Sequence, residues 1–172
     1  MQAEWNMRVK QGDTVFHLGD WCCKGNERGA PGSPSNTKAR SWELPLNGKI
    51  IHIKGNHDGN NGLKHALEYA VLKYGGLSIY LVHIPPTMLD SVPPGCNLVL
   101  CGHVHEKWKY KMLDGLPVIN VGVDVWNYRP VSGVEVIEEY EKIKKLEKLK
   151  KHENRESNAN AGIDQAKKFD PI

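Results

Sequence analysis

The sequence has no apolar run that approaches the roughly 20 residues needed to span a bilayer. Its first residues, Met-Gln-Ala-Glu-Trp-Asn, lack the apolar core of a secretory signal. The four cysteines lack the paired C-x-x-C arms of a structural zinc site, and we interpret Cys22 and Cys23 as small thiols, not as ligands. These absences predict a soluble cytoplasmic protein with reduced cysteines and no membrane partner.

Strong charge of one sign is also missing, since the formal net charge is +3 over 172 residues. Much of the basic excess lies in one late run, Lys142 to Arg155, which is not interleaved with aromatic residues. Charge alone therefore does not imply a nucleic-acid partner, although it is compatible with a nucleotide substrate. The length fits one domain over residues 1–151, followed by a polar tail at 152–172 that we expect to be disordered.

Short β-rich apolar runs alternate with glycine-rich breaks and with stretches of helical spacing. The predicted strands cover 13–18, 49–54, 77–82, 97–101, 108–113 and 116–121, the last two joined at Asp114-Gly115. The predicted helices cover 62–74, which Gly75-Gly76 would end, and the segment that starts at Ser132; one or two helical turns are expected over 37–44. A loop is expected over 25–35. This order predicts a layered α/β domain with mixed sheets.

Four fragments that follow apolar runs carry metal-ligating side chains: Leu-Gly-Asp, Gly-Asn-His-Asp, a single histidine in Leu-Val-His-Ile-Pro, and Gly-His-Val-His. Their candidate ligands are Asp20, Asn56, His83, His103 and His105. Such a mixed N/O donor set suits divalent Mn, Fe, Zn or Ni. The i, i+2 spacing of His103 and His105 would put both rings on one side of an extended backbone.

His57 stands between Asn56 and Asp58 in the same turn. If Asn56 points to a metal, His57 points to the space beside it, and Asp58 could keep that imidazole protonated. The pair would then be catalytic, with His57 as a general acid.

In this order and spacing, the four fragments resemble the calcineurin-like metallophosphoesterases, in particular a small phage and bacterial branch. The resemblance runs from about Trp5 to about Glu139. It implies a four-layer α-β-β-α sandwich and hydrolysis of phosphomonoesters or phosphodiesters by a metal-bound hydroxide. It also implies that Asp20 bridges two metals, that Asn56, His83 and His103 complete one site, and that His105 binds the other.

The sequence departs from the family pattern at its start, because nothing from Met1 to Gly19 spells the Asp-x-His of the family's first strand. We therefore expect an N-terminally incomplete fold, one bound ion instead of two, and weak or no activity. We also expect lower stability, or a homo-oligomer in which a second chain covers the exposed sheet. Three other histidines, His17, His52 and His65, are interpreted as structural.

Two other functions are compatible with these motifs. The chain could be a non-catalytic interaction module that uses the metallophosphoesterase fold as a scaffold. His-Val-His also occurs in metallo-β-lactamase-type hydrolases, but these need Asp-His shortly afterwards, and here Glu106-Lys107 follows. Lys24, Arg28 and Arg129 are within reach of a phosphate in principle, but we interpret them as solvated surface residues.

Overall fold

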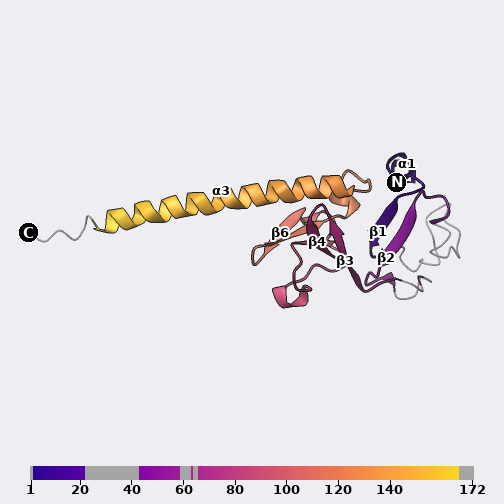
Figure 1. The fold of residues 1–172 in the computed structure, drawn as a ribbon, viewed down its shortest axis with the longest axis horizontal. Coiled ribbons are helices and arrows are strands. Elements are labelled where there is room, and N and C mark those ends of the chain that lie inside the picture. Colours follow the sequence, from indigo (N-terminus) through magenta and orange to yellow (C-terminus); the bar gives the residue numbers. More distant parts are fainter. Residues whose placement is uncertain (1, 22–42, 59–62, 64–65, 167–172) are drawn as a thin grey trace, which may run out of the picture. The chain divides into compact units, whose positions relative to one another are not determined.

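The computed structural model (Figure 1) describes residues 2–21, 43–58, 63 and 66–166, with the backbone alone from 155 onward. The chain forms two compact units, Met1–Gly133 and Val134–Ile172. Within the described ranges, no helix is both long and apolar enough to cross a bilayer. The loop predicted over 25–35, and all of the predicted turns over 37–44 except residues 43 and 44, lie outside these ranges.

Two parallel strands form the first sheet, here called sheet A. They are β1 (Thr14–Leu18) and β2 (Lys49–Ile53), paired in register from Thr14 with Lys49 to Leu18 with Ile53. Both strands were predicted from the sequence. Because parallel strands end at the same sheet edge, the residues that follow Leu18 and Ile53 are brought together.

The sequence did not predict helix α1 (Gln2–Arg8), which precedes sheet A. Two of its side chains bind the segment that leads into β2. The indole N–H of Trp5 donates to the carbonyl of Asn47 at 2.9 Å, and the Asn47 N–H donates to the Asn6 side chain at 2.8 Å. These bonds fix α1 beside the start of β2.

Five strands in the order β3-β4-β5-β7-β6 form the second sheet, sheet B (Figure 1). Their bounds are Tyr69–Tyr74 for β3, Leu77–Val82 for β4, Leu98–Cys101 for β5, Tyr110–Leu113 for β6 and Leu116–Asn120 for β7. Every residue of β5 and β7 is buried, as expected for central strands covered on both faces. A core cluster on this sheet includes Tyr80, Val99 and Val118.

The helix predicted over 62–74 is wrong, because residues 69–74 form strand β3. This strand pairs antiparallel with β4 from Tyr69 opposite Val82 to Tyr74 opposite Leu77. Gly75 and Gly76, interpreted as a helix end, have φ values of 56° and 77° and make the hairpin turn. The helical spacing of Ala66, Leu67, Ala70 and Val71 was overridden by cross-strand pairing of aromatic and β-branched residues.

Three single-turn 3₁₀ segments lie in the connections of sheet B: η2 (Leu89–Ser91), η3 (His105–Lys107) and η4 (Val123–Val125). With two mixed or parallel sheets and few helices among the described residues, the predicted α/β class is confirmed.

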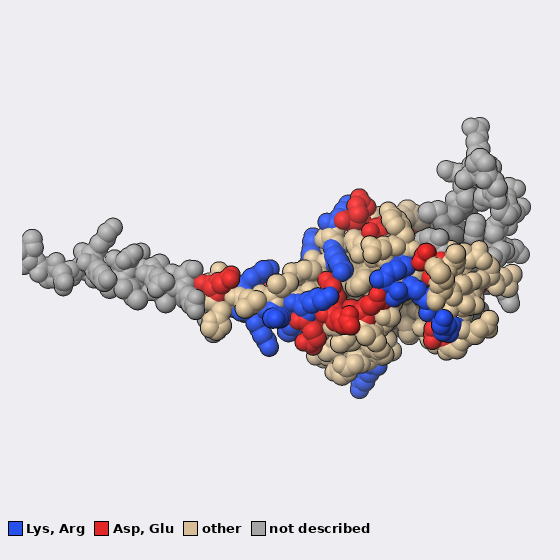
Figure 2. Space-filling view, turned by 90° about the horizontal axis from the view of Figure 1, so that it is seen from above, with Lys and Arg blue, Asp and Glu red and all other residues tan. Residues whose placement is uncertain are grey.

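The second unit is built on helix α3 (Gly133–Ala166), which begins next to the predicted Ser132. On the face shown in Figure 2, lysines lie beside acidic side chains, and Lys150 pairs with Glu147 at 2.9 Å. The apolar residues Leu146 and Leu149 are exposed, as expected for a stripe that winds around the helix. The helical backbone continues past residue 152, so a boundary between domain and tail there stays a prediction.

Candidate metal centre

Four strand ends converge at one place in the first unit. Asp20 follows β1, Asn56 follows β2, His83 follows β4, and His103 follows β5. The approach is close enough to require glycine: a Cβ on Gly55 would collide with the backbone N and the carboxylate of Asp20. In the motifs Gly-Asp and Gly-Asn-His-Asp, glycine is therefore needed for close packing, and the polar residues supply the candidate ligands.

Asp58 joins the loop after β1 to the loop after β2. Its buried carboxylate accepts backbone N–H groups from Gly55 and Asp20, each at 2.8 Å, and from Trp21 at 3.0 Å. Charge-assisted hydrogen bonds of this kind fix the backbone that presents Asp20. The structure thus gives Asp58 a positioning role, while its predicted partnership with His57 stays a prediction.

His83 lies at the centre of the site, with the buried ring held in one orientation. Its Nδ1 is 2.7 Å from the carbonyl oxygen of Leu18, so Nδ1 must carry the proton and donate it. In the neutral ring, Nε2 then carries the lone pair. A ligating histidine usually donates its second ring N–H to a carbonyl or carboxylate in this way.

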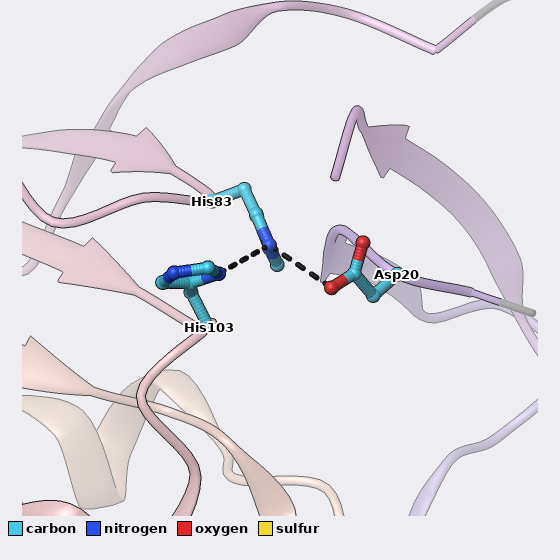
Figure 3. A group of neighbouring side chains, drawn as sticks. All are labelled: Asp20, His83 and His103. Atoms are coloured by element: carbon cyan, nitrogen blue, oxygen red, sulfur yellow. Dashed lines mark hydrogen bonds and ion pairs between the residues drawn. The ribbon is translucent and has the colours of Figure 1, made fainter. Parts of the chain in front are cut away.

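Three other Lewis bases surround the Nε2 atom of His83. Asp20 Oδ2 is 3.2 Å away and His103 Nδ1 is 3.3 Å away (Figure 3). Asn56 Oδ1 is 2.9 Å away. The ligand atoms of Asp20, His83 and His103 all lie within 4.8 Å of one another. Electron-rich atoms packed so tightly need a shared proton or a cation among them, and bonds of about 2.0–2.2 Å to one central ion suit this spacing. The donor set therefore fits a divalent metal.

The surroundings of His103 favour the neutral form of its ring. Partial burial of its ring, with the neighbouring His83 as the next contribution, lowers the pKa of His103 below its usual value. A lower pKa favours the neutral imidazole, which is the form that binds metals.

His105 does not belong to this cluster, and the extended backbone on which its predicted placement beside His103 depended is absent. The prediction assumed extended backbone, but His103 and His105 have φ values of 68° and 48°, and His105 begins η3. The side chain of His105 is 72% exposed, with Nδ1 3.4 Å from Asp124 Oδ2. Its predicted role at a second metal stays a prediction.

Asn120 positions His105 and was not recognised as a site residue from the sequence. Its fully buried side chain donates to the carbonyls of His105 at 2.7 Å and Trp108 at 2.9 Å, and accepts from Gly122 N–H at 2.9 Å. The available signal was a single amide at the end of the apolar run Leu-Pro-Val-Ile. Asp124, the partner of His105, carried no comparable signal.

The remaining candidates lie at the edge of the site or outside the described residues. The exposed His57 gives its backbone N–H to Asp20 Oδ1 at 2.9 Å, which fixes the carboxylate and leaves Oδ2 facing His83. Asn56 and His83 also line a pocket that is open to solvent, together with Glu68 and Ile84. Lys24, Arg28 and His65 lie outside the part of the chain that the structure describes.

Comparisons with known proteins agree with this geometry. The family model of the calcineurin-like phosphoesterase superfamily domain matches residues 1–137. An uncharacterized protein of Methanocaldococcus jannaschii is 33% identical over 145 residues, which cover 80% of this chain and 72% of that protein.

Solved structures add likenesses of fold. A protein of unknown function from Aquifex aeolicus superposes with a TM-score of 0.56 at 25% identity, covering 80% of this chain and 81% of the other. A more distant likeness is to an archaeal phosphodiesterase, with a TM-score of 0.41, 21% identity, and coverage of 64% and 67%. That last likeness carries no conclusion about activity. The match of the family model over most of the chain confirms the resemblance read from the motifs, and the chain belongs to the calcineurin-like phosphoesterase superfamily.

Proposed function

We propose that this chain is a metal-dependent hydrolase of phosphomonoesters or phosphodiesters, with its ion held by Asp20, Asn56, His83 and His103. The observation that carries the proposal is the convergence of three Lewis bases on His83 Nε2 at 2.9–3.3 Å. Family membership supports the reaction class. A bound Mn, Fe, Zn or Ni ion would supply Lewis-acid stabilisation of the phosphoryl oxygens and a water of lowered pKa.

The chain's own residues would prepare this chemistry. The Leu18 carbonyl fixes the tautomer of His83, and the backbone N–H of His57 fixes one oxygen of Asp20 so that the other faces the ion. The exposed ring of His57 stands beside the ligands in the same turn, where it would donate a proton to the leaving oxygen. Asp58 would act through the backbone that it fixes.

The first experiment is metal analysis and turnover of the same preparation. After loading with Mn²⁺, we expect nearer one ion than two per chain, and hydrolysis of bis(p-nitrophenyl) phosphate. His83→Asn is expected to lose at least about 100-fold in kcat/KM, as removal of a ligand generally does far more than a second-shell change. His152→Asn, which alters an exposed histidine on α3, is the matched control.

The outcomes separate hydrolase from scaffold. Two tightly bound Mn²⁺ ions would contradict the single-site stoichiometry, with His105 as the first candidate for the second site. Metal binding without turnover of either mono- or diesters would instead favour the non-catalytic interaction module.

We also propose a cytoplasmic location and self-association through sheet A. Among the described strands, β1 pairs with β2 alone, and a strand with one neighbour can pair with a strand of a second chain. Light scattering coupled to size exclusion is expected to give a mass above 19.3 kDa that falls on dilution. A monomer at all concentrations would contradict self-association and leave the hydrolase proposal untouched.

A further inference from the structure

Two histidines outside the metal centre lie side by side on sheet A. His17 in β1 and His52 in β2 are register partners, so their side chains project from the same face. Their ring centroids are 5.8 Å apart. The Trp21 indole packs edge-on against both, with centroid distances of 4.7 Å to His17 and 4.9 Å to His52.

Each ring contains a buried nitrogen without a partner. The Nδ1 atoms of His17 and His52 are both inaccessible to solvent, and neither makes a hydrogen bond with any residue that the structure describes. The His52 side chain as a whole is 10% exposed. Buried polar atoms are nearly always paired, because an unpaired one costs roughly 1–3 kcal/mol. A ligand bound to both atoms would remove this cost.

The hydrogen bonding of His52 determines what kind of ligand this is. Its Nε2 lies 2.9 Å from Glu43 Oε1, and a carboxylate can only accept, so Nε2 carries the proton. In the neutral ring, Nδ1 is then a lone-pair donor. A carboxylate behind a histidine is the usual outer-shell arrangement of a metal ligand.

His17 is also in the form that binds metals. Burial, with a further contribution from His52, lowers the pKa of His17 to about 4, so the ring is neutral at pH 7. Asp58 and Asp20 act in the opposite direction and His83 in the same direction, without reversing the shift. The structure therefore places two imidazoles, each with an unpartnered Nδ1 among the described residues, against one indole ring.

We propose that His17 and His52 bind a second cation of the class that prefers imidazole nitrogen, namely zinc, nickel or copper(II). This site differs from the cluster of Asp20, His83 and His103 in its ligands and in its oxygen-poor chemistry. Sequence analysis interpreted both histidines as structural, since each lies within a strand. The proposal does not depend on phosphoesterase activity.

The test uses the full chain with zinc chloride as probe, in a His103→Asn background that weakens the main cluster. Long-range ¹⁵N–¹H NMR distinguishes ring nitrogens that carry a proton, a lone pair or a metal. On zinc addition, we expect the Nδ1 resonances of His17 and His52 to shift together, and magnesium chloride to leave them unchanged.

Variants locate the ion. Adding His52→Phe should remove one zinc equivalent, whereas His152→Phe, the matched loss of an exposed imidazole, should not. Glu43→Gln keeps both rings and so guards against misfolding of the phenylalanine variant; it should weaken zinc binding roughly 10- to 100-fold. Unchanged Nδ1 resonances, or the same zinc stoichiometry with and without His52, would overturn the proposal and identify the space as one that holds water.

Discussion

At the scale of single residues, Asp58 shows how a buried carboxylate can organise a site through the backbone alone. It accepts backbone N–H groups from both loops that carry the proposed ligands Asp20 and Asn56. In Asp58→Asn, the amide nitrogen would face N–H donors, and the charge that strengthens these bonds would be lost.

For Asp58→Asn we expect the free energy of unfolding to fall by about 2–3 kcal/mol, and metal affinity to fall with it. Urea unfolding of the metal-free protein measures the first, and competition with a chelating dye measures the second. Asp90→Asn, at an exposed position in η2, is the control and should change stability by less than about 0.5 kcal/mol. If Asp58→Asn and Asp90→Asn changed the free energy of unfolding and the metal affinity equally, the hydrogen bonds of Asp58 to the backbone would have no special role.

Close backbone approach gives a second prediction at this scale. A Cβ at Gly55 would overlap Asp20, whereas a Cβ at Gly12 meets nothing within 4 Å. Gly55→Ala should therefore cost roughly 1–3 kcal/mol and displace Asp20 from the metal. Gly12→Ala should be neutral or stabilising by up to about 1 kcal/mol. Thermal unfolding and metal titration of both variants check this; retention of full metal affinity in Gly55→Ala would contradict the geometry.

At the scale of elements, the β3–β4 hairpin shows where local pattern and tertiary pairing disagree. Residues 66–71 have apolar spacing typical of a helix, but Tyr69, Val71 and Tyr74 are also good strand formers. Because the segment pairs with β4, it forms a strand and not a helix. Gly75 and Gly76, which the sequence suggested as a helix end, form the hairpin turn instead.

The hairpin turn can be tested through backbone strain alone. Gly76 has a φ of 77°, and a Cβ there would contact nothing within 4 Å. Gly76→Ala should thus cost roughly 1–2 kcal/mol from the left-handed conformation, while Gly76→Asn should cost less. Equilibrium unfolding measures the difference, and an alanine variant as stable as the parent would argue against this turn.

At the scale of the whole molecule, the boundary predicted at residue 151 can be tested, because the proposed function depends only on residues before it. All of the proposed ligands lie in the first unit, Met1–Gly133. In α3, Leu146 and Leu149 are exposed, and the segment after them is polar.

We expect a chain that ends at residue 151 to bind metal with unchanged affinity and to melt within a few degrees of the full chain. Calorimetry and metal titration of the two chains provide the comparison. A large drop in melting temperature would show that residues 152–172 belong to the folded domain and not to a separate tail.

The family, the α/β class, six of the strands and the residue types of the candidate metal centre could be predicted from the sequence. This was possible because strand periodicity and the Gly-Asn-His-Asp and Gly-His-Val-His motifs are local properties of the chain. The tertiary structure alone decided that His105 lies outside the cluster of Asp20, His83 and His103, that Asp58 binds backbone, and that residues 69–74 pair as a strand. It also placed His17 beside His52. Each of these depends on backbone conformation or on pairing between distant segments, which no local pattern encodes.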